Sequence, residues 1–194
     1  MKVIGITGGI ASGKSLITKS LIEEGYYVID TDKIAHQLLK DANIIEEIIR
    51  TFGDEVYVDG VVNRKILGSI IFQDKNKQQK LNNIIHPLVI EEVEHLLSIT
   101  TEALEFVDVP LLFESGMEEM MDYVIVVSVS PNIQLERLMR RDHITKEYAL
   151  NKINMQMPLS DKIKLADYII DNNDGIEDTL SQLDIIIRRV KNEI

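Results

Sequence analysis

The chain has 194 residues, of which 45% are hydrophobic and 27% are charged, and its formal net charge is −11. This length and composition suit a single domain with a sizeable core and room for a helical insertion or a lid. The negative charge opposes general binding to nucleic acid or anionic membranes, so we expect neither as a partner. The chain has no cysteine, which excludes disulfide bonds and thiolate metal sites.

The amino terminus does not have the pattern of a signal peptide, because Lys2 leads directly into a short apolar run and then into glycines. No apolar stretch of the sequence approaches the ~20 residues that a membrane span needs. We therefore expect a cytoplasmic protein, present as a monomer or a small homo-oligomer.

The strongest motif lies close to the amino terminus, where residues 8–15 read GGIASGKS and fit the phosphate-loop pattern GxxxxGK[ST]. Residues 2–7 before it are apolar and partly β-branched, which predicts a strand, and apolar residues at helical spacing follow it. In this setting the backbone N–H groups of a glycine-rich turn and the positive end of the helix dipole bind polyphosphate.

This loop supplies most of the predicted nucleotide site. We expect Lys14 to bind the β- and γ-phosphates of ATP and the hydroxyl of Ser15 to bind Mg²⁺. The alternative, that the glycines only form a tight turn before a buried helix, does not explain the adjacent lysine and serine. The residues predicted to contact the nucleotide are Gly9, Ile10, Ala11, Ser12, Gly13, Lys14, Ser15 and Leu16.

Five apolar segments that alternate with helical patterns predict five strands, at residues 2–7, 26–30, 105–109, 123–129 and 168–170. Helices are predicted after the first, second, fourth and fifth of them, the last over residues 176–190. With right-handed crossovers this order gives an α/β fold with a doubly wound, five-stranded parallel sheet.

Residues 32–98, between the second and third predicted strands, are mostly helical and too long for a plain crossover, which indicates an inserted substrate lobe. Asn63 is expected to cap a helix that runs to about Phe72, and Asp74 to cap a longer one. Asp59 and Gly60 indicate a turn, in either a short hairpin or a loop. Pro87 predicts a kink or a break in the long helix.

Two aspartates, Asp30 and Asp32, lie at the carboxyl end of the second predicted strand, the edge at which an open parallel sheet binds ligands. Asp32 lies just beyond the strand and is predicted to be the base that takes the proton of a substrate hydroxyl, while the other carboxylate could hold Mg²⁺ through water. The alternative is that both aspartates cap the following helix. Asp108 ends the third strand and is either near the metal or an ordinary strand-end residue.

Three arginines, Arg137, Arg140 and Arg141, concentrate positive charge in an otherwise acidic chain. Arginines of a closing lid stabilise the charge of a transferring phosphoryl group, and we place such a lid over about residues 137–160. The alternative is a solvated helix end at which cations offset the helix dipole. The four histidines lack the paired spacing of a metal site.

Taken together, these residues resemble the dephospho-CoA kinase family along nearly the whole chain. The phosphate loop is common to many NTPases, whereas the other shared segments are more specific in this order. The segments that carry the resemblance are residues 6–10, IDTD at 29–32, IHPL at 85–88, DVPLLFE at 108–114, residues 137–142, Gln156 and ADYIIDN at 166–172.

The resemblance implies a P-loop NTPase fold and a kinase that uses MgATP to phosphorylate the ribose 3′-hydroxyl of dephospho-CoA, the last step of coenzyme A synthesis. It implies one kinase domain, residues 1–194, with a helical CoA-binding lobe at about 32–98 and a lid at about 137–160. Carried over by position, Lys14 and Ser15 are the phosphate and magnesium residues, Asp32 is the base, and Arg141 is the lid arginine for the phosphates.

The departures from the family pattern are modest. Ala11 replaces the usual glycine of the loop, Thr31 replaces the usual alanine between the two aspartates, and Asn63 replaces the usual aspartate before Arg64. The turn after Asn172 is one residue longer. From the residues alone, a P-loop kinase for another nucleoside, nucleotide or small alcohol remains the nearest alternative, and a non-catalytic ATP-binding module is another.

Overall fold

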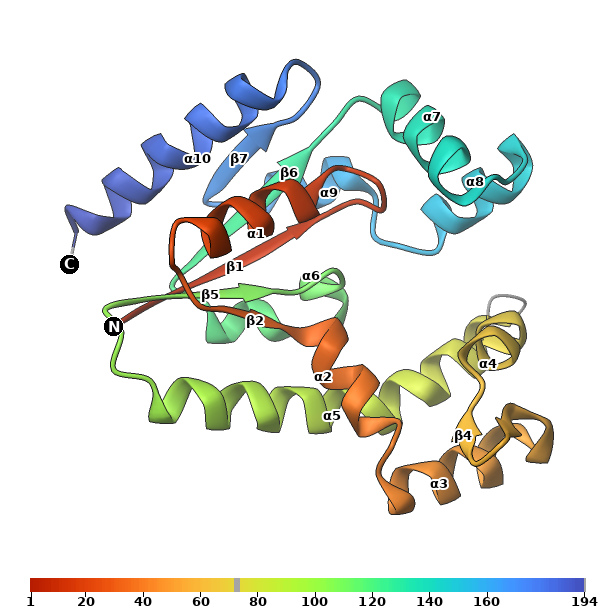
Figure 1. Ribbon diagram of the computed structural model, residues 1–194. Coiled ribbons are helices and arrows are strands. Elements are labelled where there is room, and N and C mark those ends of the chain that lie inside the picture. The colour runs from red at the N-terminus through yellow and green to blue at the C-terminus, as the bar shows by residue number, and fades with distance from the viewer. Residues whose placement is uncertain (72–73, 194) are drawn as a thin grey trace. The chain divides into compact units, whose positions relative to one another are not determined.

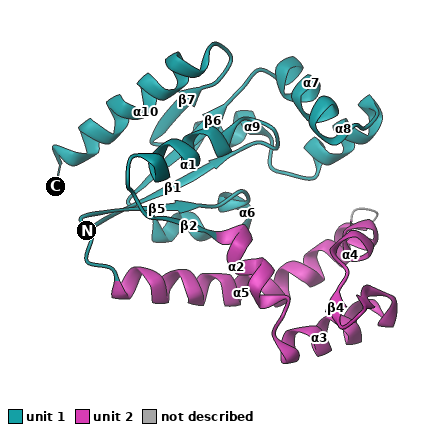
Figure 2. Ribbon diagram, viewed as in Figure 1, with its two compact units in different colours: residues 1–30, 100–194 teal, residues 31–99 magenta. Residues whose placement is uncertain are grey.

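The structure of the chain is a computed structural model that describes residues 1–71 and 74–193. It divides into two compact units, one of residues 1–30 and 100–194 and the other of residues 31–99 (Figure 2). We refer to them as the sheet unit and the helical unit. Within the described residues, no helix combines the length and apolar composition required to cross a membrane.

A five-stranded parallel sheet forms the centre of the sheet unit (Figure 1). Its strands lie side by side in the order β2, β5, β1, β6, β7, and each neighbouring pair is parallel. Their bounds are β1 Lys2–Gly8, β2 Val28–Asp30, β5 Leu104–Asp108, β6 Tyr123–Ser128 and β7 Tyr168–Asp171. The predicted α/β fold with five parallel strands is confirmed.

Helices cover both faces of this sheet, because successive side chains of a strand point to opposite faces. Ile4 and Ile6 of β1 face the core shared with α1 and α10, whereas a Cβ at Gly5 would lie 2.6 Å from Leu112 of α6. The helices of this unit are α1 Lys14–Glu23, α6 Leu112–Ser115, α7 Pro131–Asp142, α8 Lys146–Asn154, α9 Leu159–Lys164 and α10 Ile176–Lys191, with a short 3-10 helix at Met117–Met120.

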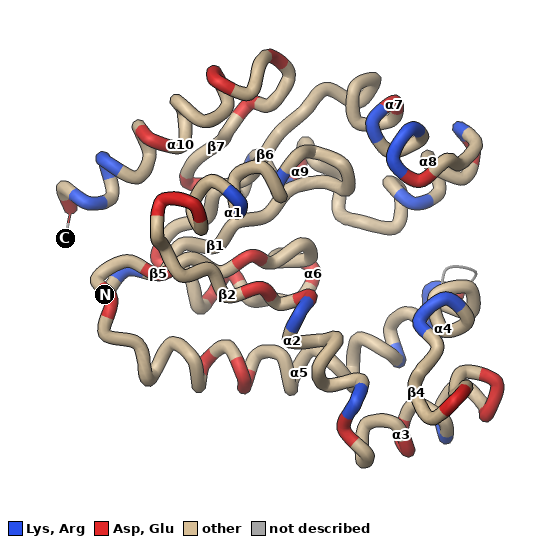
Figure 3. Tube along the Cα trace, in the orientation of Figure 1, with Lys and Arg blue, Asp and Glu red and all other residues tan. Residues whose placement is uncertain are grey.

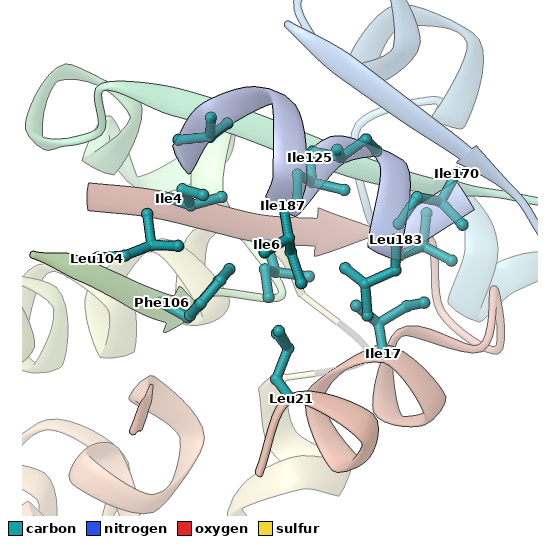
Figure 4. Packing of buried hydrophobic residues seen from close by; sticks show 13 residues of the cluster. Ile4, Ile6, Ile17, Leu21, Leu104, Phe106, Ile125, Ile170, Leu183 and Ile187 are labelled. Carbon is teal, nitrogen blue, oxygen red and sulfur yellow. The ribbon is translucent and has the colours of Figure 1, made fainter. Parts of the chain in front are cut away.

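The main hydrophobic core joins the sheet to the first and last long helices (Figure 4). β5 is buried along its whole length and β6 along most of it, which is why β6 was readable as a nearly continuous apolar run. The buried members of this core are Ile4, Ile6, Ile17, Leu21, Leu104, Phe106, Ile125, Val127, Ile170, Leu183, Ile186, Ile187 and Val190.

The helical unit consists of four helices and a two-stranded hairpin in the part of the chain that the structure describes. The bounds are α2 Thr31–Leu38, α3 Ala42–Phe52, β3 Tyr57–Val58, β4 Val61–Val62, α4 Arg64–Ile71 and α5 Lys75–Ile99, with a 3-10 helix at Asp54–Val56. One buried cluster of this unit consists of Ile48, Phe52, Val56, Val62 and Leu67, and Ile34, Ile85, Val89 and Val93 are buried as well.

Most local predictions for this unit are confirmed. β3 and β4 pair antiparallel on either side of Asp59 and Gly60, so the predicted turn belongs to a hairpin. Asn63 Oδ1 accepts the backbone N–H of Ile66 at 3.2 Å, and Asp74 Oδ1 accepts that of Asn76 at 2.8 Å. Helix α5 runs unbroken through Pro87, which excludes a break there. Phe72, the predicted end of the helix after Asn63, lies outside the described residues.

Candidate active site

The phosphate loop connects β1 to α1, and two of its residues have left-handed backbone conformations. Gly13 has a φ of 98° and Ala11 a φ of 60°. At Gly13 the glycine is required, because a Cβ there would collide with the side-chain amide of Asn172. At Ala11, where the family usually has glycine, the alanine pays roughly 1 kcal/mol for the left-handed conformation, so other contacts must hold the loop in this shape.

Three side-chain amides supply those contacts. Gln134 of α7 donates its Nε2 to the carbonyl of Ile10 at 2.9 Å, and the N–H of Ile10 donates to Gln156 Oε1, also at 2.9 Å. Asn172, which follows β7, donates its Nδ2 to the carbonyl of Ser12 at 2.8 Å. Asn172 is itself fixed by Thr179, whose hydroxyl donates to Asn172 Oδ1 at 3.0 Å. The loop is therefore held by three different parts of the sheet unit.

The predicted lysine lies against a carboxylate of the neighbouring strand. Lys14 Nζ donates to Asp108 Oδ1 in a partly buried ion pair. The contact is possible because Asp108, the last residue of β5, pairs in register with Ile6 of β1, just before the loop. The aspartate whose role the sequence left open thus lies directly at the predicted phosphate site.

The oxygen ligands near the loop fit a magnesium ion. The hydroxyl of Ser15, exposed in the first turn of α1, and the carboxylate of Asp108 are both hard oxygen donors. The described residues contain no group of three or more histidine or acidic side chains that could form a complete metal cage. That is the usual situation for Mg²⁺, which takes one or two protein oxygens and completes its shell with phosphate and water.

The two aspartates after β2 are separated by the boundary between the units. Asp30 ends β2 and pairs in register with Asp108, so the carboxyl end of β2 lies at the same edge of the sheet as the phosphate loop. Asp32, two residues further along the chain, lies in the first turn of α2, is exposed, and belongs to the helical unit. Its role as the base stays a prediction.

The three arginines of the predicted lid all lie on α7 but have different surroundings, and α7 and α8 both carry basic residues (Figure 3). A nitrogen of the Arg137 guanidinium, Nη1, lies 3.8 Å from the position that a Cβ of Gly13 would occupy, so this side chain is beside the loop. Arg141 Nε instead donates to Asp142 Oδ1 at 2.8 Å, and Lys152 Nζ donates to Asp142 Oδ2 at 2.7 Å. Hydrogen bonds from Arg141 and then Lys152 lower the pKa of the Asp142 carboxyl to about 2.

A buried ion pair connects the segment after β5 to α9. Lys162 is completely buried, and its Nζ lies 2.9 Å from Glu114 Oε1 and 3.1 Å from the carbonyl oxygen of Pro110. Burial lowers the pKa of the Lys162 ammonium, while the hydrogen bond to Glu114 acts in the opposite direction. The same Glu114 oxygen accepts the backbone N–H of Met157 at 2.9 Å.

Sequence reasoning missed Lys162 and Gln134. Helix α9 is six residues long, too short for a detectable apolar period, and Lys162 stands among other polar residues. Gln134 occupies a buried position of α7, where only its contact with Ile10 reveals its importance. Gln156 and Asn172 were noted through the family resemblance alone.

A phosphate loop between the first strand and first helix of a parallel sheet, with its lysine facing the aspartate of an adjacent strand, defines a P-loop NTPase. Comparisons with known proteins narrow this class. The dephospho-CoA kinase family matches residues 2–178 of the chain, and the chain therefore belongs to that family.

Individual relatives agree with this assignment. A dephospho-CoA kinase of Listeria monocytogenes is 42% identical to the chain, over 99% of each. A crystal structure of a Thermus thermophilus protein is 32% identical, with a TM-score of 0.83 and 97% of each chain covered. A dephospho-CoA kinase from Campylobacter jejuni is 33% identical over 100% of each chain, with a TM-score of 0.72.

Membership of this family makes the chain a phosphotransferase, whose reaction is the ATP-dependent phosphorylation of dephospho-CoA in coenzyme A biosynthesis. The family resemblance inferred from the sequence is thereby confirmed. A P-loop kinase for a different small alcohol is not favoured.

Proposed function

We propose that the protein transfers the γ-phosphoryl group of MgATP to the 3′-hydroxyl of the ribose in dephospho-CoA, giving coenzyme A and ADP. The observation that carries the nucleotide part of this proposal is the contact of Lys14 with Asp108 beside the phosphate loop. The family match supplies the acceptor.

The loop residues Gly9 to Leu16 hold the triphosphate. Their backbone N–H groups and the amino end of α1 favour a polyanion, and Lys14 neutralises charge on the β- and γ-phosphates. Ser15 would ligate the magnesium ion, which when bound would offset the negative charge of the phosphates. Asp108, which contacts Lys14, is then also close to the charges of the phosphates and of the metal ion.

Asp32 serves as the base. In the step, an oxygen–phosphorus bond forms from the 3′-hydroxyl to the γ-phosphorus, the bond from that phosphorus to the bridging oxygen breaks, and ADP leaves with those electrons. The hydroxyl proton passes to the Asp32 carboxylate. This role is supported by its exposed position two residues beyond Asp30, which ends β2 at the edge of the sheet that carries the loop.

The helical segment of about residues 32–98 acts as the lobe that receives dephospho-CoA, and about residues 137–160 act as the lid, within a single kinase domain. Arg141 is the predicted arginine for the transferring group. Arg137 is a second candidate arginine for this role, since it lies beside Gly13 and both residues belong to the sheet unit. Lid arginines contribute by stabilising charge on the equatorial oxygens and by excluding water.

A coupled ADP-release assay tests this function. The purified protein is offered MgATP with dephospho-CoA, adenosine, AMP or shikimate, and phosphorus NMR of the product reports which hydroxyl was modified. We expect turnover with dephospho-CoA far above the others and a new 3′-phosphate. Equal turnover with adenosine or AMP, or release of ADP without any acceptor dependence, would contradict the proposal.

A further inference from the structure

Both backbone hydrogen-bonding groups of Ile10, at the tip of the phosphate loop, are taken by glutamine side chains. The carbonyl accepts from Gln134 and the N–H donates to Gln156, each at 2.9 Å. The two glutamines lie 22 residues apart, one within α7 and the other between α8 and α9. A single residue of the loop is therefore held both by α7 and by the segment between α8 and α9.

We propose that Gln134 and Gln156 are positioning residues that tie the tip of the phosphate loop to the lid and thereby set the affinity of the loop for nucleotide. The inference deepens the proposed function, because it takes the loop to be the nucleotide site. Neither side chain needs to touch the substrate for this role: each acts through the orientation of Ile10.

The backbone at this point needs support. Ala11, directly after Ile10, has a left-handed φ of 60°, a conformation that alanine enters at a cost. The two hydrogen bonds on the N–H and the carbonyl of Ile10 limit the rotation of the backbone and so help to keep Ala11 in that conformation. The fit is close, since a Cβ on Gly9 would lie 2.5 Å from Gln134 Nε2. The missing side chain of Gly9 is what lets the glutamine reach the loop.

The two glutamines are themselves held in place. Gln134 is only 5% exposed, so its amide is fixed in the interior of the sheet unit. The residue after Gln156 donates its backbone N–H to Glu114, and Glu114 is paired with the buried Lys162. The contact with Glu114 therefore holds the backbone next to Gln156, and Gln156 in turn holds Ile10.

The first test removes each hydrogen bond while keeping the size of the side chain. Gln134→Met and Gln156→Met should each weaken ADP binding, measured by isothermal titration calorimetry, by about 3- to 10-fold, as expected for a lost hydrogen bond. In turnover, KM for ATP should rise while kcat stays within about twofold. ADP affinity equal to that of the unchanged protein in both variants overturns the proposal.

Ile48→Ala is the control for lost stability. Ile48 is fully buried in the core of the helical unit, which contributes no residue to the phosphate loop. This substitution should lower the melting temperature at least as much as the other two substitutions and leave ADP affinity unchanged. If all three variants weaken ADP binding in proportion to their loss of stability, the glutamines have only a structural role.

The second test uses the direction of each hydrogen bond. Glutamate at position 156 still accepts the N–H of Ile10, whereas glutamate at position 134 cannot donate to its carbonyl. Gln156→Glu and Gln134→Glu each add one negative charge next to Ile10, so charge repulsion acts on both. ADP binding should be at least about threefold weaker in Gln134→Glu than in Gln156→Glu. Equal losses contradict the hydrogen-bond account.

These measurements separate the inference from the proposed function. ADP binding needs no acceptor, so the glutamine variants remain informative even if the protein does not turn over dephospho-CoA. Conversely, normal turnover with dephospho-CoA and unchanged ADP affinity in the glutamine variants would leave the function standing and remove the positioning role.

Discussion

The two units build their cores in different ways. The core of the sheet unit joins residues as far apart in the chain as Ile4 and Val190, whereas the buried hydrophobic residues of the helical unit lie between Ile34 and Val93. The helical unit is assembled from one continuous stretch of chain, while the sheet unit exists only once distant strands have paired. In the sheet unit, bringing distant strands together costs loop-closure entropy before the strands can pair. The phosphate site therefore forms only when the whole unit has folded.

The phosphate loop shows the same dependence at the level of single contacts. Lys14 and Asp108 are 94 residues apart, Ile10 and Gln156 are 146 apart, and Ser12 and Asn172 are 160 apart, all within the sheet unit. Asp32 is the one residue of the predicted catalytic set that belongs to the helical unit. Nucleotide binding and acceptor activation should therefore respond separately to changes in the two units.

The largest effect is expected at Lys14. Lys14→Ala removes the charge that faces the β- and γ-phosphates, so it should abolish turnover and weaken ATP binding, measured by calorimetry and by ADP release. Lys19→Ala is the matched control, because Lys19 is on the same helix but is exposed and forms an ion pair with Glu23. Full activity of Lys14→Ala would show that the phosphate site has been assigned to the wrong residues.

A substitution at Asp32 tests the contribution of the helical unit. Asp32→Ala should lower kcat by about 10²–10⁴, the contribution of a positioned base, while ATP binds as before. Glu46→Ala removes a charge from an exposed position of the same unit and should leave kcat unchanged. An Asp32→Ala enzyme with normal kcat would remove this residue from the role of base, and one that had lost ATP binding would place it in the nucleotide site instead.

A pair of cavity-forming substitutions separates the units by stability. Ile48 and Ile17 are both fully buried, Ile48 in the core of the helical unit and Ile17 on α1 behind the phosphate loop. Each change to alanine should cost about 3 kcal/mol in the free energy of unfolding, measured with urea. Only Ile17→Ala should also weaken ADP binding. Equal losses of ADP affinity would mean that the two units do not act independently.

The smallest effect is expected at Asp142, in the segment predicted to be the lid. Asp142 has its pKa lowered to about 2 from 3.8, so its ion pairs stabilise the protein above about pH 4, and this contribution is lost as the pH falls towards 2. Arg141 is largely exposed, so Asp142→Asn should cost no more than about 1 kcal/mol at pH 7.

Urea unfolding at several pH values checks this prediction. The difference between Asp142→Asn and the unchanged protein should shrink as the pH approaches 2. Asp161→Asn, in an exposed i,i+3 pair with Lys164, serves as the control and should have little effect at any pH. A difference that persists unchanged at pH 2 would rule out the ion pairs as its source.

Local patterns in the sequence were sufficient for the sheet and the loop, because buried strands are continuous apolar runs and the phosphate loop has an invariant spacing. The second strand was predicted to begin at Tyr26 but begins at Val28, since the N–H of Tyr26 donates to the carbonyl of Leu21 and so belongs to the end of α1. Helices α6 and α9 were not predicted, because four and six residues are too few to show a period.

The side chains that hold the loop were harder to find. A glutamine or asparagine in a sequence carries no sign of its partner, and the partners here are backbone groups more than 100 residues away. The role of Asp108 was undecided for a similar reason: only the register of β5 against β1 brings it to Lys14. What the sequence lacked was therefore the pairing of distant segments, not their individual structures.

The groups that shape the loop are all uncharged. Gln134, Gln156 and Asn172 have no proton to gain or lose over the range in which enzymes work, and amide contacts are little affected by dissolved salt. Acidity and ionic strength can therefore alter how strongly the site attracts a polyanion, through Lys14 and the arginines, without altering its geometry. The uncharged amides thus keep the conformation of the phosphate loop constant, while the charged side chains determine how strongly it attracts a polyanion.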